Sequence, residues 1–331
     1  MDWGSILDNS ISQMFRPLTA VFALAAIGLN VHFGYTGLLN FGQVGFMAVG
    51  AYGVAISVLE WNVPLWVGVL IGIGAAVALA ALLGIPTLRL RADYLAIVTI
   101  ATGEILRLTI MAPSFRDFTG GSDGLSGYND DYTNLNPFSS GSNYGFGFLK
   151  FNAGATWNIL VGWSLVLLAV LLVWLLMRSP WGRVLKAIRE DEDAVRALGK
   201  NVFAYKMQSL IVGGVIGAFA GMYLVIQQGS TIPGNFTPSQ TFYAYVALIL
   251  GGAARIWGPV VGSMILWGLI VFTEEVLTGL VENNYISSDL ISTNQVAQVR
   301  LMLVGLGLIL LMIFRPQGIF GDRRELMLDE R

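Results

Sequence analysis

Long runs of apolar residues recur along the whole chain and restrict its fold more than any other feature. Such runs, each with few charges, lie at about residues 17–33, 38–59, 65–86, 93–112, 157–177, 204–228, 242–254, 258–277 and 296–314. A helix needs ~20 apolar residues to cross a bilayer, so most of these runs are long enough for one crossing. They are continuous and do not alternate in polarity, which excludes a transmembrane β-barrel. The sequence therefore predicts an all-α polytopic membrane protein.

Two of these runs leave the number of crossings open. Residues 242–254 are too few for a full span, and the glycines within residues 38–59 allow that run to bend back. We therefore expect about eight to ten transmembrane helices in a single membrane domain over residues 1–331. The composition agrees, because 55% of the residues are hydrophobic and only 12% are charged, against about a quarter charged in globular domains.

Several classes of function are excluded by what the sequence lacks. A net charge of −2 argues against nucleic acid as a partner, because binding to nucleic acid needs a basic surface. The absence of cysteine excludes disulfides, thiolate metal sites and cysteine nucleophiles. The sequence contains neither H-E-x-x-H nor G-x-x-x-x-G-K-[ST], the motifs of zinc proteases and phosphate-binding loops. We therefore assign this chain no catalytic residue, no metal site and no cofactor of its own.

The distribution of basic residues predicts how the chain is oriented in the membrane. Residues 178–206 hold seven of the 19 Lys and Arg residues, and residues 315–331 hold four more. Because basic loops stay in the cytoplasm, both segments are predicted to be cytoplasmic. Residues 114–156 contain two basic residues among many polar and aromatic ones and are predicted to form an extracytoplasmic loop. Counting crossings backwards then places the N-terminus outside.

Many glycines fall within the apolar runs, often four residues apart. Gly213, Gly217 and Gly221 share this spacing, which lines small residues along one helix face and allows a neighbouring backbone to approach closely. Such a face can pack inside the bundle or form a subunit interface. The sequence does not separate these two interpretations.

Some apolar runs also contain polar residues, which are expensive to bury in a membrane. Asn40 and Gln43 lie among glycines, where either a broken helix lining a polar cavity or hydrogen bonds between helices would satisfy their amides. Glu104 and Arg107 are one turn apart and can form an ion pair on one helix face. The only histidine, His32, has no companion ligands and is predicted to be structural.

The segment 178–206 is predicted to form one or two short amphipathic helices on the cytoplasmic side. Pro180 suits a helix start and Gly199 a helix stop, and the intervening apolar residues have a mostly helical spacing. An interfacial helix lying on anionic lipid is one interpretation. The acidic run Glu190-Asp-Glu-Asp193 would be repelled by anionic headgroups, so a protein partner fits better.

Within this segment, the residues Asp193-Ala-Val-Arg-Ala-Leu-Gly199 resemble the EAA-xxx-G coupling motif of ABC-importer permeases. The surrounding Ser179-Pro-Trp-Gly-Arg and Leu198-Gly-Lys-Asn-Val202 are similar to the branched-chain amino acid permease family, in its LivM-type branch. The stretches Gly34–Tyr52, Arg89–Arg107, Thr119–Leu125 and Leu250–Pro259 agree with the same family in the same order. Arg255 departs from it, since family members usually carry small or polar residues there.

The resemblance implies a type II-like ABC importer permease in the cytoplasmic (inner) membrane of a bacterium or archaeon. Its implied partners are a homologous LivH-like permease, two ATP-binding subunits that supply ATP and Mg²⁺ chemistry, an extracytoplasmic solute-binding protein and membrane lipid. Residues 178–206 would then form the coupling loop, through Arg183, Arg189, Glu190, Asp191, Glu192, Asp193, Ala194 and Gly199. The translocation pathway is predicted to pass Asn40, Gln43, Thr99, Thr102 and Glu104.

The implied solute is a branched-chain or other small neutral amino acid, and this chain would form half of its pathway. Urea or short-amide transport, known for close relatives of the same family, remains an alternative. Composition alone also permits an ion-coupled secondary transporter, because broken helices and Glu104 would suit ion coupling. The coupling-like loop favours an ABC permease, since an ion-coupled carrier has no need of it.

Overall fold

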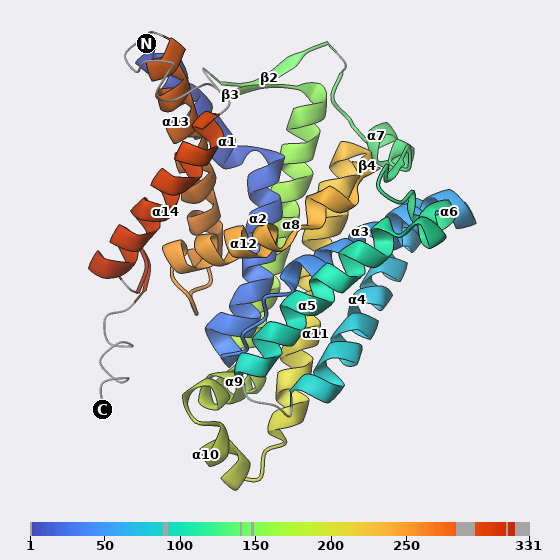
Figure 1. The fold of residues 1–331 in the computed structure, drawn as a ribbon, viewed down its shortest axis with the longest axis vertical. Coiled ribbons are helices and arrows are strands. Elements are labelled where there is room, and N and C mark those ends of the chain that lie inside the picture. The colour runs from blue at the N-terminus through green and yellow to red at the C-terminus, as the bar shows by residue number, and fades with distance from the viewer. Residues whose placement is uncertain are drawn as a thin grey trace.

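The computed structural model describes residues 2–88, 92–139, 141–146, 149–282, 295–315 and 317–321, and these are mostly helical (Figure 1). Seven helical segments are long and apolar enough to cross a membrane. They are α2 with the π-helix η1 (Pro17–Leu29 and Asn30–Tyr35), α3 (Gln43–Trp61), α4 (Leu65–Thr87), α5 (Ala92–Met111), α8 (Ala153–Arg178), α11 (Val202–Gln228) and α13 (Gly258–Glu282).

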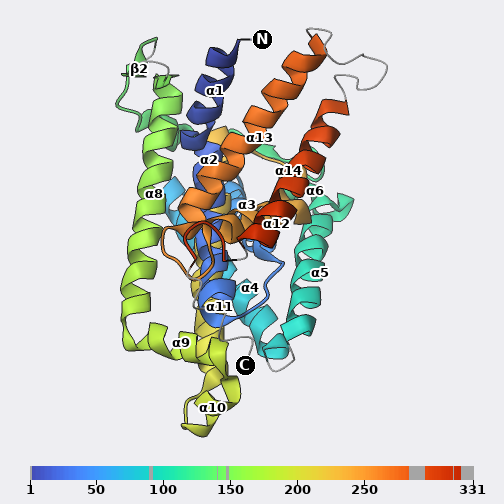
Figure 2. The ribbon, with the colours of Figure 1, turned by 90° about the vertical axis from the view of Figure 1, so that its left-hand side faces the viewer.

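Three further helices complete the bundle. The first, α1 (Trp3–Phe15), precedes α2, and the second is the 19-residue α14 (Val296–Phe314). The described residues thus contain seven candidate spans, one fewer than the lower end of the predicted range, and the apolar part of α14, Val296–Gly307, is among the shorter apolar helices. The 14-residue α12 (Pro238–Gly251) is too short to cross, as the length of its apolar run predicts. Figures 1 and 2 show α12 lying across the middle of the molecule, where the chain turns into α13.

Short elements gather at the two ends of the bundle. The helices α9 (Pro180–Glu190) and α10 (Glu192–Ala197) project at one end, opposite the N-terminus (Figure 2). The remaining short elements connect the long helices: η2 (Pro113–Phe115), α6 (Arg116–Thr119), β1 (Leu125–Ser126), α7 (Asp130–Asn134), β2 (Asn143–Phe146), β3 (Leu149–Asn152), β4 (Ser230–Thr231) and η3 (Pro233–Phe236). The strands form two antiparallel pairs, β1 with β4 and β2 with β3.

The buried centre of the bundle consists of α2, α3 and α11, which approach closely because glycines face one another. A Cβ atom on Gly28 of α2 would lie 2.5 Å from the Gly213 carbonyl oxygen of α11, and one on Gly50 of α3 would lie 2.7 Å from the Ala218 carbonyl oxygen. The Gly213 and Gly217 face therefore packs inside this chain. Of the two interpretations of the glycine spacing, packing within the bundle is confirmed for α11.

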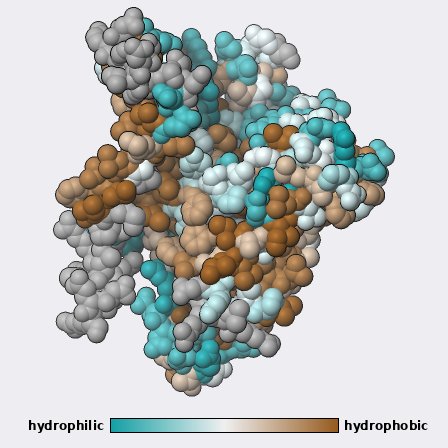
Figure 3. Space-filling model, viewed as in Figure 1, coloured by the Kyte–Doolittle hydropathy of each residue, from teal (hydrophilic) through white to brown (hydrophobic). Residues whose placement is uncertain are grey.

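The outer faces of α4 and α8 carry large apolar side chains that are exposed in the isolated chain. Leu82 and Leu168 are more than 60% exposed. Figure 3 shows hydrophobic residues across the middle of the molecule and hydrophilic residues around α9–α10 at one end and α6–α7 at the other. This is the distribution expected of a protein that spans a bilayer.

The acidic residues near the end of α13 lie at the same end of the molecule as the N-terminus. Asp2 and Ser5 of the N-terminal segment line one pocket with Glu274 and Glu275 of α13. Arg89, Arg91 and most of the predicted tail 315–331 lie outside the described residues. The described part of that tail contacts α12, since the backbone N–H of Ile319 donates to the Leu250 carbonyl oxygen at 3.0 Å.

Candidate functional site

The second half of the first long helix changes from α to π geometry and then stops. The π-helix η1 ends at Tyr35, the chain from residue 36 to 42 is not part of a long helix, and α3 begins at Gln43. Gly37 within this break has φ +75°, a conformation that glycine adopts without strain. We call residues 36–42 the interruption. The structure thus has a break in this region, as in the first of the two alternatives left open by the sequence.

Asn30 ties the beginning of η1 to the turn between α12 and α13. Its side-chain Nδ2 donates to the Arg255 carbonyl oxygen at 2.8 Å, and its Oδ1 accepts from the Ala254 N–H at 2.8 Å. Each of these turn residues lacks a helical partner for the group that Asn30 binds, because α12 ends at Gly251 and helix ends leave backbone groups unsatisfied. Arg255, which departs from the family pattern, therefore lies in the turn between α12 and α13, where this turn is bonded to the start of η1.

A buried polar network lies directly after η1. Asn40 Nδ2 donates to Gln43 Oε1 at 3.1 Å and lies 3.1 Å from His32 Nδ1, while Gln43 Nε2 donates to the Gly213 carbonyl oxygen at 3.1 Å. His32 Nε2 lies 3.1 Å from the Leu210 carbonyl oxygen. Because a carbonyl only accepts, Nε2 carries the proton and Nδ1 accepts from Asn40. His32 is thus structural, as predicted.

The side chains of Asn40, Gln43 and His32 are fully buried. Each of the two interpretations of Asn40 and Gln43 is therefore correct in part. The helix is broken, and the amides are satisfied by hydrogen bonds to η1 and α11. Sequence spacing could not reveal Leu210 or Gly213 as partners, since each is a backbone carbonyl far along the chain.

The predicted polar residues of α5 separate into two groups. Thr99 Oγ1 accepts from the Phe41 N–H at 3.0 Å, which joins α5 to the interruption. Thr102 Oγ1 donates within its own helix, to the Val98 carbonyl oxygen at 2.8 Å. Glu104 binds Arg107 and lies roughly 140° around the helix from Thr99. The structure thus brings Asn40, Gln43 and Thr99 together and leaves Thr102 and Glu104 apart from them.

The segment 178–206 forms two helices, as predicted, with Pro180 in the first turn of α9. Leu185, Ile188 and Val195 are buried against the bundle. Asp191 separates the helices and caps α10, since its Oδ1 accepts from the N–H groups of Asp193 and Ala194 at 2.9 and 3.0 Å. This capping stabilises the first turn of α10. We call α9 and α10 together the α9–α10 hairpin.

Arg189 connects the hairpin to the interrupted helix. Its Nη1 donates to the Gly34 carbonyl oxygen at 2.5 Å, and its Cγ lies against Gly37, where an added Cβ would be 3.4 Å away. Lys186, one turn earlier, lies 5.8 Å from the centroid of the Tyr35 ring. The end of η1 is therefore held by α9 through both a hydrogen bond and a cation–π contact.

The acidic run after α9 is divided between local roles and solvent. Glu192 pairs with Lys206 at the start of α11 and with Arg196 at 2.8 Å. Asp193 pairs with Arg196 at 2.7 Å. Glu190 is exposed. Arg183, Ala194 and Gly199 are exposed too, and Leu198, expected on the apolar face, is instead 80% exposed.

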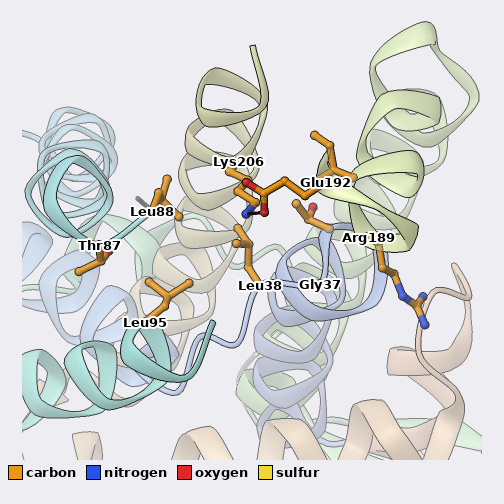
Figure 4. Close-up of a pocket in the computed structure, with 10 residues that line it drawn as sticks. Gly37, Leu38, Thr87, Leu88, Leu95, Arg189, Glu192 and Lys206 are labelled. Atoms are coloured by element: carbon orange, nitrogen blue, oxygen red, sulfur yellow. Dashed lines mark hydrogen bonds and ion pairs between the residues drawn. The ribbon is translucent and has the colours of Figure 1, made fainter. Parts of the chain in front are cut away.

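A pocket of about 290 Å³ lies between the hairpin and the membrane helices (Figure 4). Leu38, Leu88 and Leu95 supply apolar walls from the interruption, the end of α4 and α5. Glu192 and Lys206 point toward each other across it, whereas the Arg189 guanidinium points away from them (Figure 4). Sequence reasoning did not select Lys206 as a site residue, because its partner lies 14 residues away in a different helix.

Comparison with known proteins decides what class of membrane protein carries this arrangement. A family model described as the permease component of the branched-chain amino acid transport system matches residues 15–314. The chain belongs to this permease family. It is accordingly a membrane-spanning permease subunit of an ABC importer and a transport subunit, not an enzyme.

Three relatives illustrate how far the likeness extends. The high-affinity branched-chain amino acid transport system permease protein LivM of Escherichia coli (strain K12) is 32% identical, over 93% of this permease and 69% of the relative. A probable LivM of Methanocaldococcus jannaschii is 26% identical, over 92% and 91%. The permease protein LivH of the same E. coli strain is also 26% identical, over 94% and 95%.

Proposed function

We propose that this permease imports branched-chain or other small neutral amino acids and forms half of the translocation pathway. The family description and the names of the relatives support this solute class.

The observation that carries the proposal is the contact between Arg189 of α9 and Gly34 of η1. ATP-binding subunits that close at the cytoplasmic surface must move helices inside the membrane, and they need a rigid connection to those helices to do so. The α9–α10 hairpin is short, internally capped and bonded to the broken helix. We therefore propose residues 178–206 as the coupling loop and the α9–α10 end of the molecule as cytoplasmic.

The proposed docking surface for an ATP-binding subunit is the outer side of the hairpin. Arg183, Glu190, Asp193, Ala194 and Gly199 are exposed there, and Arg189, Asp191 and Glu192 hold the hairpin in place through the hydrogen bonds and ion pairs described above. Leu198 adds an apolar contact, since it is 80% exposed on an otherwise charged surface. ATP and Mg²⁺ would be bound by two such subunits and not by this chain.

The other proposed partners follow from the same orientation. The loop 114–156 and the N-terminus would lie outside, where a solute-binding protein delivers the solute, and the C-terminus would lie in the cytoplasm. A homologous permease would complete the pathway, and the likeness to both LivM and LivH relatives supports such a pair. The pathway itself is proposed to pass the partly exposed Glu104 on one side of α5. Thr102 and Thr99 lie on the other side of that helix, toward Asn40 and Gln43, and are proposed to contribute from there.

The direct test is to reconstitute the permease with its partner permease, ATP-binding subunits and binding protein in liposomes. We expect ATP-dependent uptake of leucine, isoleucine or valine, and much less uptake of urea or acetamide. Uptake of urea or acetamide in place of amino acids would overturn the proposed solute. Uptake driven by an ion gradient without the ATP-binding subunits would overturn the proposed mechanism.

Coupling can be tested separately in the same liposomes. Reversing the charges of Glu190 and Asp193 to lysine should weaken docking and lower ATP-dependent uptake while leaving the fold intact. A matched control is Lys150→Glu, which reverses an exposed charge in β3 at the opposite end of the molecule. Equal uptake in the hairpin variant and this control would contradict the proposed docking surface.

A further inference from the structure

Glu104 and Arg107 form a two-pronged ion pair within the α5 span. Arg107 Nη2 lies 2.5 Å from Glu104 Oε1, and Arg107 Nε donates to Glu104 Oε2 at 2.9 Å. The third guanidinium nitrogen, Nη1, lies 3.1 Å from Met111 Sδ. Both side chains therefore lie along the helix, and the guanidinium is oriented by contacts on its two sides.

The pair is partly accessible, with side-chain exposures of 36% for Glu104 and 18% for Arg107. Its neighbours on the same face, Ile97, Ala101 and Leu108, are exposed as well. On the side of the molecule on which α5 lies, polar and apolar residues are mixed (Figures 1 and 3). An accessible ion pair is unfavourable in contact with hydrocarbon, because charged groups are poorly solvated there. This part of α5 is therefore better suited to a water-filled pathway than to lipid.

From these observations we infer that the pair recognises the zwitterionic head of a transported α-amino acid. This inference rests on the amino-acid transport proposed above. Arg107 would take the α-carboxylate and Glu104 the α-ammonium group. The planar guanidinium fork matches a carboxylate with two parallel hydrogen bonds, and the glutamate carboxylate accepts from an ammonium group. Arg107 is thus added to the proposed pathway residues.

Charge balance explains why such a pair suits transport. When the zwitterion binds, each side chain exchanges one opposite charge for another, so no uncompensated charge is left in a low-dielectric environment. When the solute leaves, Glu104 and Arg107 pair again with each other. The pair therefore competes with the solute for the same hydrogen bonds, which keeps binding weak enough for release.

Solute access can be measured with thiol labelling, because the natural sequence has no cysteine. A single cysteine at Ala101, one turn before Glu104, reports on the surroundings of the intact pair. In the reconstituted complex, we expect this cysteine to react with a water-soluble methanethiosulfonate and leucine to slow the reaction. A matched control is Leu167→Cys on α8, which is 54% exposed and is expected to face lipid and stay unreactive.

The same labelling in a Glu104→Gln and Arg107→Gln background tests recognition itself. Glutamine is isosteric with Glu104 and keeps a shorter polar side chain at Arg107, and the two changes remove both charges, so leucine should no longer protect the Ala101→Cys thiol. An unreactive thiol, or protection by leucine that persists in the amide background, would overturn the inference.

Transport provides a second, independent readout. The Glu104→Gln and Arg107→Gln double variant should import leucine at least about tenfold more slowly, since charge-assisted hydrogen bonds to the solute are lost. Stimulation of ATP hydrolysis by the loaded binding protein should persist, because docking is untouched. Arg107→Lys should restore part of the uptake. If the natural complex imports leucine and the double variant does so equally well, this inference is wrong while the proposed function stands; if the natural complex imports no amino acid, both fail.

Discussion

The guanidinium of Arg189 donates a hydrogen bond to the carbonyl oxygen of Gly34, 155 residues earlier in the chain. Gly34 lies in the last turn of the π-helix, where backbone carbonyls have lost their helical partners. A basic side chain is well suited to such a helix end, because the partial negative charge of the helix is concentrated there. The hairpin thus binds the membrane domain at the point where the helix breaks.

Removing this hydrogen bond should weaken the connection without unfolding the permease. We expect Arg189→Ala to lower ATP-dependent uptake about tenfold, the effect of losing one charge-assisted hydrogen bond, and Arg189→Lys to retain more activity. Uptake and ATP hydrolysis in liposomes measure both effects. Lys150→Ala, at the other end of the molecule, serves as the control, and unchanged uptake in Arg189→Ala would contradict the proposed coupling role of this contact.

Gly199 ends α10 with φ +77°, and a Cβ atom there would meet no atom within 4 Å. Any effect of substitution therefore comes from backbone conformation and not from a clash. Gly199→Ala should destabilise the hairpin by about 1 kcal/mol, and Gly199→Asn by less, because asparagine tolerates this conformation. Hydrogen exchange of the α10 amides measures the difference, and equal exchange in the two variants would contradict the argument.

The close contact between α2 and α11 should make Gly213 intolerant of any side chain. Gly213→Ala would place a Cβ 2.5 Å from the Gly28 carbonyl oxygen, so the two backbones must move apart. We expect a loss of about 1–3 kcal/mol, as for other overpacked cores. Gly74→Ala in α4 is the control, because its Cβ meets nothing within 4 Å. In the same detergent, the unfolding temperature of Gly213→Ala should be well below those of the natural protein and the control.

The buried network should respond strongly to loss of the Asn40 side chain. Asn40→Leu removes the donor to His32 and Gln43 and the acceptor of the Gly42 N–H. Each buried group left without a partner costs about 1–3 kcal/mol. Ser164→Ala is the control, since that exposed hydroxyl bonds only within its own helix and its loss should change stability by less than about 0.5 kcal/mol. A similar unfolding temperature for the two variants would contradict the network.

The loop between α5 and α8 should lose stability at high pH through Tyr132. Its hydroxyl donates to Asn158 Oδ1 at 2.7 Å, and burial raises the pKa of Tyr132 above its ordinary value. As the pH rises above about 10, the tyrosine ionises in the unfolded chain but stays neutral in the folded one, so folding becomes less favourable.

At pH 8, Tyr132→Phe should be less stable than the natural protein, because the substitution removes the hydrogen bond to Asn158. Its stability should also fall less steeply above pH 10. Unfolding by denaturant at a series of pH values in detergent measures both effects. Parallel pH profiles for the two proteins would show that Tyr132 does not contribute to the alkaline loss.

The local parts of this protein could be predicted from the sequence. Apolar runs gave the positions of the long helices, since a span needs a minimum length of hydrocarbon-compatible side chains. Pro180 and Gly199 predicted the limits of the hairpin because each acts on its own backbone. The Glu104–Arg107 pair was predictable as well, because residues three apart on a helix are neighbours.

The tertiary structure decided which distant groups meet. Asn40 and Gln43 bind backbone and side-chain groups on α2 and α11, and Arg189 binds a carbonyl oxygen that every residue type possesses, so no residue pattern marks these partners. The separation of Glu104 from Asn40 also depends on how α5 is rotated against α3. Sequence alone determined that the chain spans a membrane, because that property depends on local hydrophobicity. Only the tertiary structure decided how the hairpin is attached, because its contacts depend on how whole helices pack together.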